Sequence, residues 1–213
     1  PLAIVLRDQL RSRSTTKVIA SAIGIKAWLE KTPGVDAVRP SRCVGCGRAS
    51  RPVGRQLVVH GHGFVERQVR GPLGVGEPPG TVVVAARKFE CQACGSVMTV
   101  VPTGVLPGRH YSGPAIAHAL FLWLVEGLAD RVVRARVGAW PIARRGRRRG
   151  WTQLYRWTRE ATALFALPRP VPIGADARTS ARRVAELLGH MSTGPDPAAR
   201  IFAGAASSTT MAL

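Results

Sequence analysis

The chain has 213 residues, 46% of them apolar, which is enough for one or two small domains with a modest core. The 31 Lys and Arg against 12 Asp and Glu give a formal net charge of +19, which indicates a polyanionic partner. The most apolar run, AIAHALFLWLV, is about half as long as a membrane span, and LAIVL near the start is too short for a secretory signal. We therefore expect a soluble, cytoplasmic protein without a membrane partner.

In chain order, the first predicted element is a short amphipathic helix over residues 18–30, ended by Pro33 and Gly34. We assign residues 1–38 to an N-terminal helical segment. The sequence then divides into a cysteine-containing region, a helical region and a C-terminal region, with the following predicted bounds: 39–110, 111–167 and 168–213.

All four cysteines lie in two matching motifs, CVGCG at 43–47 and CQACG at 91–95. Two disulfides would suit a secreted protein, and a thioredoxin-like redox centre requires one Cys-x-x-Cys at a helix start. A third interpretation, one tetrahedral metal site, explains both copies, because each motif brings two sulfurs to one ion and the following Gly lets the turn close. We predict one zinc ion, with rubredoxin-like iron as the alternative, and these ligands: Cys43, Cys46, Cys91 and Cys94. Four protein ligands leave no open position for water, so the site is structural.

The segment between the cysteine motifs has the composition of β-structure. Strands are predicted at 56–60 and 64–70 around a Gly-rich HGHG turn, then at 81–90 and 97–101. His60 and His62 are interpreted as strand residues rather than metal ligands. Together these elements predict a zinc ribbon, a small antiparallel sheet stabilised by its metal ion.

From Tyr111 onward the pattern is helical. Three helices are predicted at 112–127, 128–138 and 151–165, the first with Ser112 as its N-cap. The apolar face of the third comprises Trp151, Leu154, Tyr155, Thr158, Ala161, Leu164 and Phe165. Trp123, Trp151 and Trp157 are expected in the core. The fold class is thus α+β, a four-cysteine zinc ribbon followed by a three-helix, helix-turn-helix-like domain. A Pro-rich linker, a further helix at 177–191 and a partly disordered tail from PAARIFAG onward complete the chain.

Ten arginines and no acidic residue occur between Arg131 and Arg159. A GC-rich genome raises the arginine content of a chain, but it does not explain this clustering. The densest run is RRGRRR, whose charges repel one another unless they are solvated or face a polyanion such as nucleic acid. We predict DNA contacts from the arginines of that run: Arg144, Arg145, Arg147, Arg148 and Arg149.

The polar face of the third helix carries residue types that form hydrogen bonds with base edges in DNA complexes. Arg pairs two donors with guanine, and Gln pairs with adenine. A helix of this kind beside a basic loop suits the major groove. The predicted contacts are Thr152, Gln153, Arg156 and Arg159, the alternative being an ordinary solvated helix face.

The order of these motifs resembles a known family. Over residues 39–167 the chain contains, in this order, the first Cys-x-x-Cys-Gly motif (a zinc knuckle), a VHG strand, a VRGP turn, a strand ending RKFEC, the second knuckle and a helix with WTQLYRW. This order is similar to the N-terminal zinc-ribbon and helix-turn-helix region of bacterial insertion-sequence transposases, and to small transposase-related proteins that keep that region alone. The resemblance implies that the four cysteines bind zinc and that the helix from Trp151 recognises DNA. One departure is the connection of twelve residues, 139–150, where a helix-turn-helix has three or four.

A second departure concerns catalysis. Transposases cut DNA with three acidic residues around divalent metal in an RNase H-like fold. After Leu167 this chain offers Asp176, Glu186 and Asp196, none on a predicted strand. We see no complete catalytic constellation and do not expect an enzyme.

The leading hypothesis is a zinc-dependent DNA-binding protein of transposase origin, associated with the bacterial nucleoid and lacking the nuclease. The alternatives are an RNA-binding zinc-ribbon protein that belongs to a ribosome or another ribonucleoprotein, and a protein-docking zinc module in a nucleoprotein complex.

Overall fold

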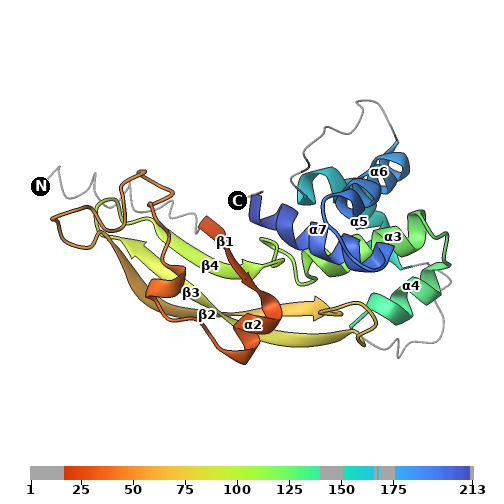
Figure 1. Ribbon diagram of the computed structural model, residues 1–213, viewed down its shortest axis with the longest axis horizontal. Helices are drawn as coiled ribbons and strands as arrows, with labels where there is room; N and C mark the ends of the chain where they lie inside the picture. Colours follow the sequence, from red (N-terminus) through yellow and green to blue (C-terminus); the bar gives the residue numbers. More distant parts are fainter. Residues whose placement is uncertain (1–16, 140–150, 166, 168–175, 212–213) are drawn as a thin grey trace, which may run out of the picture.

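The structure is a computed structural model that describes residues 17–139, 151–165, 167 and 176–211 (Figure 1). In this part of the chain it is an α+β fold, a four-stranded mixed sheet with six α-helices. The elements are β1 (Lys17–Gly24), α2 (Ile25–Glu30), the 3-10 turn η1 (Asp36–Val38), β2 (Val59–Gly71), β3 (Gly80–Cys91), β4 (Val97–Thr103), α3 (Gly113–Leu124), α4 (Asp130–Val137), α5 (Thr152–Leu164), α6 (Ala177–His190) and α7 (Pro197–Met211).

The sheet has the strand order β1-β4-β3-β2. β2 with β3 and β3 with β4 are antiparallel, whereas β1 runs parallel to β4, with Lys17 opposite Met98. The prediction of an amphipathic helix over 18–30 was therefore wrong in its first half, where β1 lies, and right only for α2. The free edge of β4 offers hydrogen bonds to an extended partner, and this tertiary pairing outweighs a weak helical pattern.

The HGHG segment was predicted as a turn between two strands and instead lies inside one strand, β2. The pairing of β2 with β3 shifts register between Gly61 and Phe64, and Gly63 has a φ of 84°. A glycine with positive φ allows a bulge that bends the strand without ending it. The glycines of this segment therefore mark a bulge in a long β2–β3 ribbon.

Helix α3 is the centre of the helical region. All twelve of its residues are buried, and α4, α5, α6 and α7 each pack against it. The predicted N-cap is confirmed, because the Ala115 backbone N–H donates to Ser112 Oγ at 3.2 Å. The helix predicted at 177–191 is also confirmed as α6. The described helical region thus contains five packed helices, the three predicted within residues 111–167 together with α6 and α7.

The C-terminal tail was predicted to be partly disordered, but it forms helix α7. Ile201, Phe202 and Ala205 are buried in the helical region. A Cβ at Gly204 would collide with the Leu188 carbonyl of α6, so the small residues that weaken the sequence signal allow the two helices to approach closely. The Thr103 hydroxyl of β4 donates to the Ala206 carbonyl at 2.7 Å and joins α7 to the sheet.

Two hydrophobic cores result. Trp28 of α2 is fully buried against the sheet, its Nε1 donating to the Ala85 carbonyl at 3.0 Å, together with Phe89 and Met98. The second core lies between the helices around α3. Figure 1 shows helices α3 to α7 gathered at one end of the long β2–β3 ribbon, while the loops that carry the cysteines lie at the other.

Candidate metal centre and cationic cavity

The two cysteine motifs meet at the end of the β2–β3 ribbon. Cys91, the last residue of β3, pairs with Val59, the first residue of β2. Just before β2, the Val58 N–H donates to the Ser50 carbonyl and the Gln92 N–H donates to the Val58 carbonyl, both at 2.9 Å. Backbone pairing therefore brings together two motifs that are far apart in the sequence.

The two motifs also share one backbone geometry. Gly47 N–H donates to the Cys43 carbonyl and Gly95 N–H donates to the Cys91 carbonyl, each at 2.8 Å, and both glycines have a φ of 71°. In each motif the N–H of the first cysteine donates to the carbonyl five residues later, at 2.9 Å in the first and 3.0 Å in the second. An L-residue adopts this φ at a cost, which explains the Gly after each second cysteine.

The four sulfurs form one cluster, in which every pair of Sγ atoms lies within 4.8 Å. The Cys43–Cys94 distance is 3.6 Å and the Cys46–Cys91 distance is 3.8 Å. Sulfurs placed tetrahedrally around zinc at Zn–S of about 2.3 Å lie roughly 3.8 Å apart. A disulfide requires about 2.05 Å, so all four cysteines are free thiols. The cluster is positioned to hold a metal ion and is consistent with a structural zinc.

The sulfurs differ in their surroundings. Cys43 and Cys91 are buried, whereas Cys46 and Cys94 are exposed. Burial raises the pKa of the Cys91 thiol to about 12. For Cys94 burial also acts upward, but hydrogen bonds from Ser96 and neighbouring thiols outweigh it and lower the pKa to about 6. Four adjacent thiolates repel one another, so a divalent cation is what allows all four to lose their protons.

The two histidines of the HGHG segment do not join the cysteine cluster. His60 Nε2 lies 2.9 Å from the Leu57 carbonyl oxygen, and His62 Nδ1 lies 3.6 Å from a carboxylate oxygen of Glu90. Both side chains are exposed on β2. Their interpretation as strand residues rather than ligands agrees with this placement.

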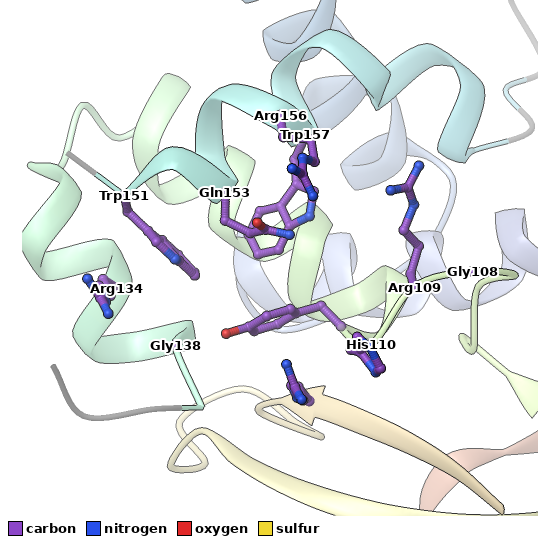
Figure 2. A pocket seen from close by; sticks show the side chains of 11 residues that line it. Gly108, Arg109, His110, Arg134, Gly138, Trp151, Gln153, Arg156 and Trp157 are labelled. Atoms are coloured by element: carbon purple, nitrogen blue, oxygen red, sulfur yellow. The ribbon is translucent and has the colours of Figure 1, made fainter. Parts of the chain in front are cut away.

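The predicted DNA-contact residues are divided by the structure. Arg144, Arg145, Arg147, Arg148 and Arg149 lie outside the described residues. On α5, Thr152 and Arg159 are exposed at the surface, whereas Gln153 and Arg156 line a cavity of about 250 Å³ (Figure 2). The polar face of α5 is therefore split between open surface and cavity.

The cavity lies where the end of β2 meets the helices. Arg70 N–H donates to the His110 carbonyl at 2.7 Å, and Ser112 N–H donates to the Arg70 carbonyl at 3.1 Å, which fixes the loop before α3. Gly71 has a φ of 103°, and a Cβ there would lie 2.5 Å from Ala115 Cβ, so this close crossing requires glycine. The lining residues are Arg70, Gly108, Arg109, His110, Tyr111, Arg134, Gly138, Trp151, Gln153, Arg156 and Trp157.

Three aromatic rings connect the walls of the cavity. Tyr111 lies edge-on to Trp157 with centroids 5.0 Å apart, and Trp151 lies 5.1 Å from Trp157 and 6.1 Å from Tyr111. The Tyr111 hydroxyl accepts from the Ala139 N–H at 3.3 Å, just after α4. This triad holds the loop before α3, the end of α4 and the start of α5 in fixed positions.

Two expectations for α5 require correction. Tyr155 was predicted on the apolar face but is 48% exposed, and Trp157 is buried in its place. Trp151 was expected in the core but is half-buried at the cavity. The remaining predicted members of this face are all buried: Leu154, Thr158, Ala161, Leu164 and Phe165. Trp123 and Trp157 do lie in the core, as predicted.

The charge around the cavity is one-sided. Four arginines and one histidine line it, and no acidic side chain does so among the described residues. Glu160, nearby on α5, forms an ion pair with Arg109 at 3.1 Å. Arg70, Arg109 and His110 were missed in the sequence because each looks like an ordinary loop or strand-end residue, and only the fold brings them to α5.

Comparisons of the chain with protein-family models, curated proteins and solved structures found no match. The resemblance to transposases therefore stays a prediction from the motifs. In the described ranges, none of the helices combines the length and the apolar character that crossing a membrane requires.

Proposed function

We propose that this chain is a zinc-dependent DNA-binding protein whose helices α4 and α5 contact duplex DNA. The observation that supports the proposal is the state of five arginines on these helices. Among the described residues, no carboxylate forms an ion pair with any of them: Arg131, Arg134, Arg136, Arg156 and Arg159. All five are exposed or half-buried, so their charge is available to phosphates.

Helix α6 provides the internal comparison. Arg182 and Arg183 pair with Glu186 at 3.2 and 3.5 Å, and Arg178 stacks over Trp123 at 4.5 Å. Helices α4 and α5 also carry one acidic residue each, Asp130 and Glu160, but among the described residues neither pairs with an arginine of its own helix, as Glu186 does on α6. The uncompensated charge of α4 and α5 favours an external anion, and the predicted contacts in the RRGRRR run would extend it.

In this proposal the cysteine cluster binds one zinc ion and completes a zinc ribbon. The ligand set is closed, so the ion orders the two knuckles and leaves no position for a substrate. Binding free energy at such sites is largely folding free energy. The metal therefore stabilises the sheet end of the protein, while DNA contacts come from the helical end.

The transposase resemblance supplies the biological setting of the proposal, a bacterial module of mobile-element origin. Helices α4 and α5 both pack against α3. We propose that contacts between their exposed arginines and DNA phosphates provide most of the affinity. Contacts between side chains of α5 and the bases would provide the sequence specificity.

The test uses two double variants with the same change in charge. Arg136→Gln with Arg159→Gln removes two exposed, uncompensated charges, and Arg182→Gln with Arg183→Gln removes two compensated ones. Affinity for random duplex DNA is measured by fluorescence anisotropy at two salt concentrations. The first variant should reduce the slope of log affinity against log salt by roughly 1 to 2, and the second should leave it unchanged.

Two results would contradict the proposal. Equal losses in both variants would mean that only overall charge matters. Tighter binding of structured RNA than of duplex DNA, measured with the same metal-loaded protein, would favour the RNA-binding alternative.

A further inference from the structure

We infer that the cationic cavity between β2, α4 and α5 is a binding site for the phosphate monoester of a nucleotide. The nucleotide would be the 5′-phosphorylated end of a nucleic acid strand or a free nucleotide. The inference rests on the proposed function only for the first of these two sources. Binding of the DNA backbone by exposed arginines does not require an enclosed cavity. The inference assigns a ligand of its own to this cavity.

The first argument is charge. Arg70, Arg109, Arg134, Arg156 and His110 line about 250 Å³, and in the described part of the chain no acidic residue lines it, although Glu160 pairs with Arg109 from outside the lining at 3.1 Å. Like charges close together repel, and a bound anion offsets that repulsion. A phosphate monoester carries about −1.5 to −2 charges and three terminal oxygens, whereas a phosphodiester carries −1. Guanidinium groups bind such oxygens in pairs.

The second argument is the presence of aromatic and amide groups among the cations. Trp151 and Tyr111 are half-buried and line the cavity, so part of each ring is accessible to a stacking base. Gln153 supplies both a donor and an acceptor for a base edge. In the view of Figure 2, Gln153 lies between Arg134 on one side and Arg109 on the other. A site for inorganic anions alone needs no such groups.

The third argument is size and order. Pockets for drug-sized ligands range over about 300–1,000 Å³, so a cavity of about 250 Å³ suits a ligand no larger than one nucleotide. The aromatic triad and the backbone hydrogen bonds of Arg70 fix three of its walls. Little ordering is then needed on binding, which favours affinity for a small ligand.

The experiment compares the metal-loaded full chain with two single variants on α5. Arg156→Gln removes a cavity charge, and Arg159→Gln removes another exposed charge of the same helix that does not line the cavity. Each protein is titrated with a short blunt duplex bearing 5′-phosphates and with the same duplex bearing 5′-hydroxyls. Adenosine 5′-monophosphate and adenosine are titrated separately by calorimetry.

The parent should bind the phosphorylated duplex roughly tenfold more tightly than the hydroxyl duplex. Arg156→Gln should abolish this preference, whereas Arg159→Gln should weaken both duplexes alike and keep the ratio. Adenosine 5′-monophosphate should bind the parent but not Arg156→Gln, and adenosine should bind neither. Circular dichroism spectra that match the parent's exclude unfolding as the cause.

The outcomes separate the two proposals. Duplex binding that ignores the 5′ end, together with no binding of adenosine 5′-monophosphate, overturns this inference and leaves the proposed function standing. Binding of adenosine 5′-monophosphate that depends on Arg156, without binding of duplex DNA, supports the site and identifies its ligand as a free nucleotide. Preference for the phosphorylated duplex that persists in Arg156→Gln also overturns the inference.

Discussion

The cysteine-bearing end of the sheet buries few apolar side chains, whereas the helical end buries a continuous core around α3. In the loop between Ser41 and Val58, which carries the first cysteine motif, most residues are exposed. Cys43 of this loop and Cys91 of the second motif are among the few buried side chains. Around α3, by contrast, five helices contribute Leu, Ile, Val, Phe and Trp side chains to one cluster.

With the cysteine cluster proposed as a structural zinc site, this difference explains why one end would depend on a metal ion and the other would not. A short loop with few apolar contacts cannot offset the conformational entropy lost on ordering, so metal ligation has to supply the free energy. Helices with a wide apolar face supply it by burial. The two ends should therefore respond to metal and to core mutations independently, and the following predictions test that independence.

The largest effect is expected on removing the metal. Cys43→Ser, or treatment with a strong chelator, should disorder the knuckles, because structural zinc sites contribute roughly 10 kcal/mol or more. Hydrogen exchange should show loss of protection at the Val58 and Gln92 amides, which join the knuckles, with protection retained at Ile116 of α3. Metal analysis should give one zinc per chain in the parent and none in the variant.

Val44→Ser is the matched control, since Val44 lies between two cysteines, is 45% exposed and supplies no ligand. It should retain the zinc and the protection of both amides. Unchanged exchange at Val58 and Gln92 after complete chelation would contradict a structural role for the metal.

The next effect concerns the helical core. Leu120 is fully buried in α3, and Leu120→Ala should lower the free energy of unfolding by about 2–5 kcal/mol through lost burial and a cavity. Urea denaturation followed at a helical signal measures this loss. The loss should be the same with zinc and with chelator, and a loss that depends on metal would show that the two ends fold as one unit.

In each of these two ends, some elements could be predicted from the sequence and others could not. The cysteine motifs identified the cysteine cluster because ligand spacing is local and specific, and strong periodicity identified α3, α5 and α6. β1 and α7 were missed, since β1 depends on the free edge of β4 and α7 on close packing against α6. Both depend on partners far away in the chain, which a local pattern does not contain.

A pH-dependent effect is expected at the contact between α3 and α7. His118 is 7% exposed and lies 5.1 Å from the Phe202 ring. Burial and then the positive charge of Arg136 lower its pKa to about 4, while Asp196 acts in the opposite direction. The unfolded chain therefore binds a proton that the folded chain does not between the ordinary pKa of about 6.5 and pH 4.

Stability of the helical end should accordingly fall as the pH falls from about 6.5 to about 4, by an amount on the order of 3 kcal/mol. His118→Leu should remove this part of the pH dependence, as measured by thermal unfolding between pH 4 and 7. His190→Leu, at an exposed position of α6, should keep it. A pH dependence identical in the parent and His118→Leu would show that another group is responsible.

The cationic cavity shows the same limit of local patterns. Gln153 and Arg156 were identified from the polar face of α5, because helical spacing places them together. Arg70 and Arg109 belong to a strand end and a loop, and nothing in their sequence surroundings connects them with α5. The sequence could therefore predict only the wall of the cavity that α5 contributes, where helical spacing places the residues together. The other walls are brought there by the fold.

The smallest effect concerns the ion pairs of α6. Arg182→Gln should change the free energy of unfolding by no more than about 0.5 kcal/mol, because exposed i,i+4 pairs are weak. Denaturation at low and high salt should give nearly the same value.

Glu186→Gln is more informative, since it leaves Arg182 and Arg183 without an acidic partner, as the arginines of α4 and α5 are. If uncompensated charge alone created affinity for duplex DNA, this variant should bind more tightly than the parent with a steeper salt dependence. Unchanged binding would instead show that position on α4 and α5, rather than the lack of an acidic partner, decides which arginines contact DNA.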